Sequence, residues 1–254
     1  MKNNATLVYR RIILKMSGEI LKGNCESEID LCLLNRMIKE IKSLIKIGIQ
    51  VGIVVGGGNL IRGSNVKKIG VSVNTADHMG ILSTIINGLV ITDTMNRCAI
   101  KAQLMSAISV SGICQIYNVE KAIYLLSKQC VLVFSGGIGC PFFTTDSAAC
   151  IRGIEVKADI VLKATKVNGV YSSDPKKNYD AIMYQNIKYE DVLNQDLKIM
   201  DSTAIILARD HSLPICIFNM YKSGALYRIM TGEQEGTLII SWWKIISINI
   251  YGYM

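Results

Sequence analysis

Short aliphatic and β-branched runs alternate along this chain with segments of helical periodicity. We expect strands over Leu7–Met16, Ile49–Val55, Leu104–Ile108, Cys130–Phe134, Asp159–Lys163, Pro214–Phe218 and Thr237–Ile240. Strands that are separated by helices are typical of a mainly parallel sheet with helices packed on it. The alternation therefore predicts the α/β class.

The segments between these runs carry helix signals. The clearest helix begins after Asp30, a suitable N-cap, and repeats apolar residues at i, i+3 and i+4 until Gly48 can end it. Further helices are expected over Ala76–Met95, Val119–Ser127, Thr144–Ile154 and Met200–Arg209. Asn168-Gly169 predicts a tight turn inside a hairpin. Because the sequence has no repeat, low-complexity stretch or linker, residues 1–254 are expected to form a single domain.

Composition narrows the function classes. The 28 Lys and Arg residues against 20 Asp and Glu residues give a net charge of +8. This charge favours an anionic partner, or it reflects only a compositional drift of the whole sequence toward Lys and Ile. A structural zinc site is not expected, because the eight cysteines contain no C-x-x-C pair and the chain has only two histidines. A disulfide framework is not expected either. No export signal is found, and no apolar run reaches the ~18 residues of a membrane helix. We expect a cytoplasmic protein with reduced thiols.

Two glycine clusters, at 56–58 and 136–139, each follow an expected strand. They are either phosphate cradles, in which backbone N–H groups approach an anion, or tight turns. Lys15 ends the first expected strand, where ligands of open α/β sheets bind, although a surface lysine is the alternative. Arg62 could clamp a phosphate, and Asp77 could bind a ligand or offset a helix dipole.

Two later stretches carry polar groups in a dense arrangement. The first stretch is Pro141-Phe142-Phe143-Thr144-Thr145-Asp146, which places two hydroxyls and a carboxylate at the start of an expected helix. This arrangement suits phosphate binding beside a buried acid. Leu162 to Tyr171, followed by Asp174, offers lysines, a hydroxyl and an aromatic ring, although an exposed hairpin explains much of it. His78 has no nearby Ser or Cys partner, so a hydrolytic triad has no support. His211 follows an expected helix and is expected to be a cap or a surface residue rather than a base.

Six blocks of this sequence resemble, in order and spacing, those of the bacterial uridylate (UMP) kinases of the amino-acid-kinase fold family. The blocks are Leu14–Glu19, Gly56–Gly63, Asp77–Gly80, Pro141–Asp146, Lys163–Asp174 and Ala208–His211. The resemblance implies a three-layer α/β/α sandwich with a mainly parallel central sheet. It also implies an acceptor site in the N-terminal half and an ATP site in the C-terminal half.

The implied activity is reversible transfer of the ATP γ-phosphoryl group to UMP, giving UDP and ADP on the route to UTP and CTP. The resemblance further implies Mg²⁺ with ATP, a homohexamer and inhibition by UTP. Two alternatives stay open: another kinase of this fold that acts on a carboxylate or carbamate, and a basic nucleic-acid-binding protein. The second lacks support because the chain has no long Lys/Arg run and no nucleic-acid motif.

The resemblance assigns site residues by their match to the family blocks. The ATP site is expected at Lys15, Met16, Ser17, Gly18, Gly58, Arg62, Thr165, Tyr171 and Asp174. The UMP site is expected at Gly57, Asp77, Ile138, Gly139, Cys140, Pro141, Phe142, Phe143, Thr144 and Thr145. Phosphoryl transfer needs positioning and positive charge, so Lys15 and Lys163 are the expected catalytic cations and Asp146 the acid that holds them. No metal ligands are expected from the protein itself.

The chain departs from the family pattern at four places. Ile138 and Cys140 stand where the family carries Thr and Asn. The tail 241–254 has no counterpart in the family, and it is either a dispensable extension or a segment that contacts another subunit or a membrane. Positions that hold GTP phosphates through basic side chains in the family are neutral here: Thr92, Asn96, Gln103 and Cys130. The segment Gly23–Glu28 also adds two carboxylates. We therefore expect weak or no activation by GTP.

Overall fold

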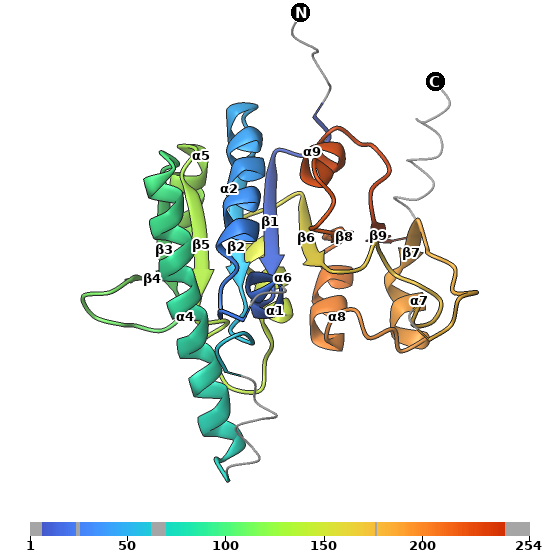
Figure 1. Ribbon diagram of the computed structural model, residues 1–254, viewed down its shortest axis with the longest axis horizontal. Helices are drawn as coiled ribbons and strands as arrows, with labels where there is room; N and C mark the ends of the chain where they lie inside the picture. Colours follow the sequence, from blue (N-terminus) through green and yellow to red (C-terminus); the bar gives the residue numbers. More distant parts are fainter. Residues whose placement is uncertain (1–6, 24–25, 62–69, 176, 242–254) are drawn as a thin grey trace, which may run out of the picture.

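A nine-stranded sheet forms the centre of the computed structural model, which describes residues 7–23, 26–61, 70–175 and 177–241 (Figure 1). The strand order is β4-β3-β5-β2-β1-β6-β8-β9-β7. All neighbouring strands run parallel except β8 and β9, which are antiparallel. The strands are β1 (Arg11–Met16), β2 (Gln50–Val55), β3 (Ala102–Ser106), β4 (Gln115–Ile116), β5 (Val131–Ser135), β6 (Ile160–Thr165), β7 (Asn186–Lys188), β8 (Ile215–Asn219) and β9 (Thr237–Ile240).

Helices cover both faces of this sheet. They are α1 (Gly18–Lys22), α2 (Leu31–Lys46), α4 (Val73–Arg97), α5 (Val119–Ser127), α6 (Thr145–Glu155), α7 (Tyr189–Asn194), α8 (Ser202–Asp210) and α9 (Ala225–Met230). Alternate residues of β1 enter two separate cores: Ile12 and Leu14 pack with α1, α2, α4 and α9, whereas Ile13 packs with α5 to α8. This period of two produces three layers, as expected for the α/β/α sandwich.

The helix boundaries follow the capping chemistry of the sequence. Asp30 accepts a hydrogen bond from the Leu33 N–H at 3.0 Å and begins α2, and Gly48 follows that helix with φ +92°. Thr144 caps α6 by accepting from the Asp146 N–H at 3.0 Å. These local signals were sufficient to predict both helices. His211 is the C-cap of α8, one of the two roles that its position suggests.

The predicted hairpin turn at Asn168-Gly169 is wrong. β6 pairs in parallel with β1 and β8, and the chain after it bends away until Tyr171 forms an isolated antiparallel bridge to Met183. Gly169 does not have the left-handed φ that a tight turn requires. Its Cα instead lies so close to β9 that an added Cβ would stand 2.4 Å from Thr237 Oγ1. The glycine serves a close contact between segments rather than a turn.

Three element boundaries also differ from expectation. β1 starts only at Arg11, because the preceding segment bonds to α9 through the Val8 N–H and the Met230 carbonyl at 3.0 Å. β3 lies two residues earlier than expected, and α4 starts at Val73 after the Ser72 cap. Asp77 is therefore beyond the first turn of α4, where a side chain does little to offset the helix dipole. Within the described ranges, no helix is long and apolar enough to cross a membrane.

Candidate active site

The predicted site residues gather at one edge of the sheet. β1, β2, β5 and β6 are parallel neighbours, so their carboxyl ends lie together, and Figure 1 shows their connecting loops at the same end of the molecule. Lys15 and Lys163 occupy paired positions on β1 and β6. The two glycine clusters follow β2 and β5. Parallel pairing thus brings together motifs that are far apart in the sequence.

Asp146 joins the two lysines in a buried ionic cluster. The Lys15 ammonium forms an ion pair with Asp146 Oδ1 at 2.7 Å, and Lys163 Nζ donates to Asp146 Oδ2 at 2.7 Å. Lys163 also donates to the Ile199 carbonyl. Lys15 is 5% exposed and Asp146 8%, so little water screens the cluster. One carboxylate against two ammonium groups leaves a net positive charge at the edge of the sheet.

The electrostatics of the cluster favour an ionised Asp146. Burial alone raises the pKa of its carboxyl, but Lys15 and Lys163 outweigh that effect and hold the pKa below its ordinary value. Burial lowers the pKa of Lys163, an effect that Asp146 partly opposes and Lys15 reinforces. The cluster therefore presents positive charge that an approaching phosphate would stabilise.

The first glycine cluster lies directly against the turn after β1. An added Cβ on Gly18 would stand 2.4 Å from Asn59 Oδ1 and 2.6 Å from the Gly58 nitrogen, so only glycine fits there. The Gly56 N–H donates to the Met16 carbonyl at 2.7 Å, and Ser17 caps α1. Met16, Ser17, Gly18 and Gly58, four of the predicted ATP-site residues, are therefore adjacent to one another and to Lys15.

A buried amide pair supports this loop, and sequence reasoning missed it. Asn59 and Asn87 exchange side-chain hydrogen bonds at 3.1 and 2.7 Å, and Asn87 also donates to the Gly56 carbonyl at 2.7 Å. Asn87 is fully buried in the middle of α4. The signal that could have revealed it is a polar residue on the apolar face of a long helix, because buried amides require partners.

The second glycine cluster is held by α4. The Gly136 N–H donates to Thr84 Oγ1 at 2.7 Å, and the Phe142 N–H donates to Asp77 Oδ2 at 2.8 Å. Phe142 has φ +72°, a conformation that is costly for a residue with a Cβ. The hydrogen bond to Asp77 fixes the loop 136–143 in that shape. Asp77 thus has a structural contact in addition to the ligand role that its block implies.

A cavity of about 170 Å³ opens between the two glycine clusters and α4. Its lining includes predicted UMP-site residues and one predicted ATP-site residue: Gly57, Gly58, Asp77, Ile138, Cys140, Phe143 and Thr145. Gly139, Pro141, Phe142 and Thr144 belong to the same loop but are not part of this lining. The structure therefore brings most of the predicted acceptor residues around one space.

Asp201 connects the start of α6 to α8, a role that sequence reasoning did not assign. Its carboxylate accepts from Thr144 Oγ1, from Ser147 Oγ at 2.8 Å and from the Ala204 N–H at 2.8 Å. The same group therefore caps α8 and fixes the segment that carries Asp146. An aspartate near the start of the expected helix Met200–Arg209 was the available signal.

The remaining predicted residues within the described ranges lie at or after the end of β6. Thr165 ends that strand, with its hydroxyl 2.7 Å from the Val167 carbonyl and 3.0 Å from the Phe218 carbonyl. Tyr171 and Asp174 follow, and Asp174 starts a turn through backbone bonds from Lys177 and Asn178. Arg62 lies outside the described residues.

A second, separate cavity of about 830 Å³ lies between α4 and β3. Its lining contains all four positions at which the resemblance implies basic GTP contacts, namely Thr92, Asn96, Gln103 and Cys130. Among its lining residues, Lys101 and Asp93 carry opposite charges, and Asp93 forms an ion pair with Arg97 at 2.8 Å. The charges of the lining residues themselves therefore sum to zero, and Arg97, which is not part of the lining, pairs with Asp93.

Comparison with known proteins agrees with the blocks and the geometry. The chain is 55% identical over 237 residues to the uridylate kinase of Buchnera aphidicola subsp. Baizongia pistaciae, covering 93% of this chain and 98% of that relative. It is 55% identical over 239 residues to the uridylate kinase of Serratia proteamaculans, covering 94% and 99%. The solved UMP kinase of Bacillus anthracis superposes with a TM-score of 0.90 at 36% identity, covering 92% of this chain and 97% of that one.

Residues 10–219 match the amino acid kinase family. That range contains β1 to β8 and the Lys15–Asp146–Lys163 cluster. On the match, and on the extent of the likeness to its relatives, this chain belongs to the amino acid kinase family.

Proposed function

We propose that this protein is a UMP kinase, which transfers the γ-phosphoryl group of ATP to UMP and gives UDP and ADP for the synthesis of UTP and CTP. The observation that carries the proposal is the buried Lys15–Asp146–Lys163 cluster between two glycine loops at the carboxyl edge of the sheet. The proposal of UMP as the acceptor is supported by the uridylate kinases that are 55% identical to this chain over nearly its whole length.

The two lysines supply the positive charge that the reaction needs. Charge develops on the oxygens of the transferring phosphoryl group, and fixed cations near those oxygens lower the barrier. Lys15 lies beside the glycine loop and is the main candidate for the cation that stabilises the transferring phosphoryl group. Lys163, which pairs with the other oxygen of the Asp146 carboxylate, is the second candidate. Asp146 keeps both ammonium groups in place before substrate arrives. No general base is needed, because the acceptor phosphate of UMP is already ionised at neutral pH.

The two substrates would occupy neighbouring parts of this edge. Backbone N–H groups near Ser17, Gly18 and Gly58 would receive the ATP phosphates, together with Arg62, and Thr165, Tyr171 and Asp174 would line the nucleoside end. UMP would enter the cavity between the glycine clusters, with Asp77 near the ribose and the loop 138–145 around the base and phosphate. This arrangement places the acceptor site in the N-terminal half of a single domain and ATP toward the C-terminal half.

Magnesium is expected to arrive with ATP. Within the described part of the chain, no three His, Cys, Asp or Glu side chains are grouped as metal ligands. Mg²⁺ in such enzymes is held largely by substrate phosphates and water, with one or two carboxylates at most, so these residues fit a nucleotide-borne ion. When bound, it would neutralise negative charge on the phosphate oxygens.

The proposal extends to location, assembly and regulation. We place the enzyme in the cytoplasm as a homohexamer that UTP inhibits, as the family resemblance implies. GTP would have little effect, since the cavity that holds Thr92, Asn96, Gln103 and Cys130 lacks a net positive charge.

A coupled assay of ADP release tests the activity. UMP, CMP, acetylglutamate and aspartate would be compared at equal concentration with ATP and Mg²⁺. We expect UMP to give the highest kcat/KM by a wide margin. A preference for acetylglutamate or aspartate would replace the proposal with a carboxylate kinase of the same fold.

A further inference from the structure

One face of α4 lies against both glycine clusters. Asp77, Gly80, Thr84 and Asn87 recur at intervals of three or four residues, so they share that face of the helix. Figure 1 shows α4 extending past the carboxyl end of β5, the strand that the second cluster follows. Polar side chains that are buried on a helix need partners, and here the partners are loops of the proposed active site.

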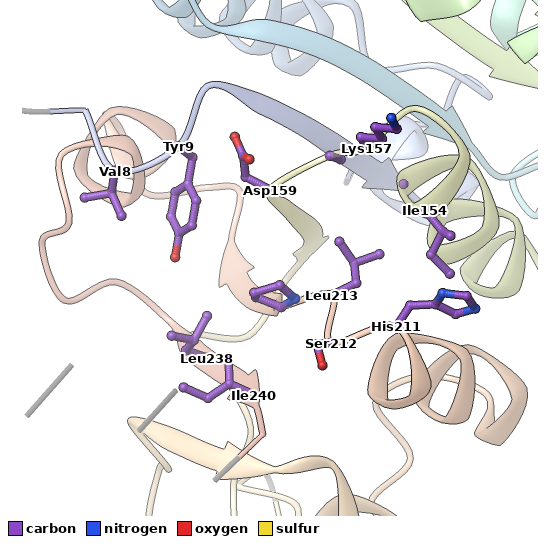
Figure 2. Close-up of a pocket in the computed structure, with 13 residues that line it drawn as sticks. Val8, Tyr9, Ile154, Lys157, Asp159, His211, Ser212, Leu213, Leu238 and Ile240 are labelled. Atoms are coloured by element: carbon purple, nitrogen blue, oxygen red, sulfur yellow. The ribbon is translucent and has the colours of Figure 1, made fainter. Parts of the chain in front are cut away.

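This face belongs to the edge of the sheet that carries the lysine cluster. The cavity of about 670 Å³ in Figure 2 lies at the other edge, at the amino ends of the strands, where Tyr9, Lys157 and Leu213 line it. None of the α4 residues, 73–97, lines that cavity. The polar face of α4 therefore serves the proposed active site and not the cavity at the amino ends.

Asn87 holds the loop after β2 through a complete set of amide hydrogen bonds. Its Nδ2 donates to the Gly56 carbonyl and to Asn59 Oδ1, at 2.7 Å each, and its Oδ1 accepts from Asn59 Nδ2 at 3.1 Å. Asn59 also donates to the Glu28 carbonyl at 2.8 Å. The carbonyl and the N–H of a trans peptide point in opposite directions, so the bond to the Gly56 carbonyl also fixes the direction of the Gly57 N–H.

Thr84, three residues before Asn87, holds the loop after β5. Its hydroxyl accepts from the Gly136 N–H at 2.7 Å and donates to the Ile81 carbonyl at 2.7 Å, so its single hydrogen is already in use. Thr84 is 3% exposed, although it contributes to the lining of the acceptor cavity. The hydroxyl therefore acts on the loop rather than on a ligand.

Close packing keeps the first loop at a fixed separation from α4. An added Cβ on Gly57 would stand 2.7 Å from Ser83 Cβ and 2.8 Å from the Gly80 carbonyl oxygen. The loop thus touches the helix one turn before Thr84 as well as at Asn87. A shift of the loop along the helix would break these contacts.

Phosphoryl transfer requires the two substrates at a defined separation. The reacting atoms must lie about 3–3.5 Å apart, and a misplacement of about 1 Å can lower the rate about 100-fold. The loop after β2 carries Gly58, which is expected to receive ATP phosphates, and the loop after β5 carries the residues expected around UMP. Side chains three residues apart on a helix lie about 5–6 Å apart at Cβ, so Thr84 and Asn87 tie the two loops together over a short, rigid distance.

We propose that Thr84 and Asn87 are positioning residues for the phosphoryl transfer, an inference that rests on the proposed UMP kinase activity. Asn87 sets the loop that receives the ATP phosphates, and Thr84 sets the loop that surrounds UMP. One turn of α4 thereby fixes the separation of donor and acceptor before either of them binds.

Thr84→Val and Thr84→Ser test the acceptor half. Valine keeps the shape but removes the acceptor of the Gly136 N–H, so the KM for UMP should rise about tenfold while the KM for ATP stays within about twofold. Serine keeps the hydroxyl and should restore the KM for UMP. Thr94→Val is the matched control, since Thr94 is a buried threonine of the same helix whose hydrogen bonds, to Val90 and Arg97, stay within α4.

Asn87→Ala tests the donor half. The loop after β2 loses its support from α4, so the KM for ATP should rise about tenfold, a change that Thr84→Val does not share. Asn59→Ala removes the other member of the amide pair and should change the KM for ATP in the same direction. It is the second variant in case Asn87→Ala does not fold, which far-UV circular dichroism would show.

Wild-type turnover of UMP separates the two possible failures. A wild type that does not phosphorylate UMP refutes the proposed function itself. If the wild type is active and the variants change neither KM, or change both KM values equally, this inference alone is refuted. A residue that only stabilises the fold lowers the active fraction, and hence kcat, without changing the KM for one substrate. A Thr84→Ser variant with the same raised KM for UMP as Thr84→Val would also refute it.

Discussion

At the scale of single residues, the site depends on one carboxylate that serves two cations. Asp146 contacts Lys15 and Lys163 at 2.7 Å each, and all three side chains are largely buried. Removal of one partner from such a cluster leaves charge that water cannot solvate. The residues that we propose to act on phosphate are thus also residues whose loss would destabilise the fold, and the two effects must be measured separately.

Lys15→Ala should lower kcat by about 100-fold or more, because one well-placed charge that stabilises a transition state contributes about 3–4 kcal/mol. Steady-state kinetics with UMP and ATP give the value, and a thermal melt of the same sample shows the folded fraction. Lys198→Ala is the matched control, since Lys198 pairs with Asp196 on the surface. Near-normal turnover in the Lys15 variant would remove this residue from the mechanism.

Asp146→Asn should destabilise the fold most strongly near neutral pH, by about 3–5 kcal/mol, because two buried ammonium groups lose their carboxylate. The folded pKa of Asp146 is lowered, so its stabilising effect is fully present above the unfolded pKa of about 3.9 and is lost as pH falls through the folded value. Thermal melts across acidic and neutral pH should show the difference between wild type and variant narrowing in acid. A constant difference would contradict this account.

At the scale of elements, the glycine loop after β2 fits against the turn between β1 and α1 without room for a side chain. Gly18 touches the backbone of Gly58 and Asn59, and Asn87 of α4 holds the far side of the same loop. The two turns are therefore one rigid unit whose backbone N–H groups are positioned before any phosphate binds. Such positioning lowers the cost of ordering the site on binding.

Gly18→Ala should lower the melting temperature far more than Gly58→Ala. The added Cβ at position 18 meets backbone atoms at 2.5–2.6 Å, whereas at position 58 it meets nothing within 4 Å. Overpacking of this kind costs about 1–3 kcal/mol. Differential scanning calorimetry of the two variants measures the difference, and equal melting temperatures would show that the loop can move apart.

At the scale of the whole molecule, the cavity between α4 and β3 lies apart from the proposed active site. Its lining includes Thr92, Asn96, Gln103 and Cys130, with Lys101 and Asp93 as opposite charges. An anionic effector would have to bind there without a surplus of positive charge. A regulatory site in the family position would therefore be electrostatically weakened in this chain.

GTP should give no saturable activation of the proposed kinase activity at subsaturating ATP. Each lost charge-assisted hydrogen bond is worth roughly 1.5–3 kcal/mol, so two or three losses weaken binding by several orders of magnitude. A titration of GTP into the ADP-release assay measures the response, with UTP as a positive control for effector binding. Several-fold activation at submillimolar GTP would show that the effector binds elsewhere or by other contacts.

The sequence by itself determined seven of the nine strands of the described sheet, the main helices and the residue types of the site motifs, but not the short strands β4 and β7. Apolar periodicity and caps such as Asp30 and Thr144 are local signals that the structure retains almost unchanged. Only the tertiary structure decided which motifs meet. The parallel pairing of β1 with β6 puts Lys15 beside Lys163, and the close approach of Gly169 to β9 replaces the expected hairpin. Local propensity is read within a few residues, whereas register and contact depend on burial between segments that are far apart in the chain.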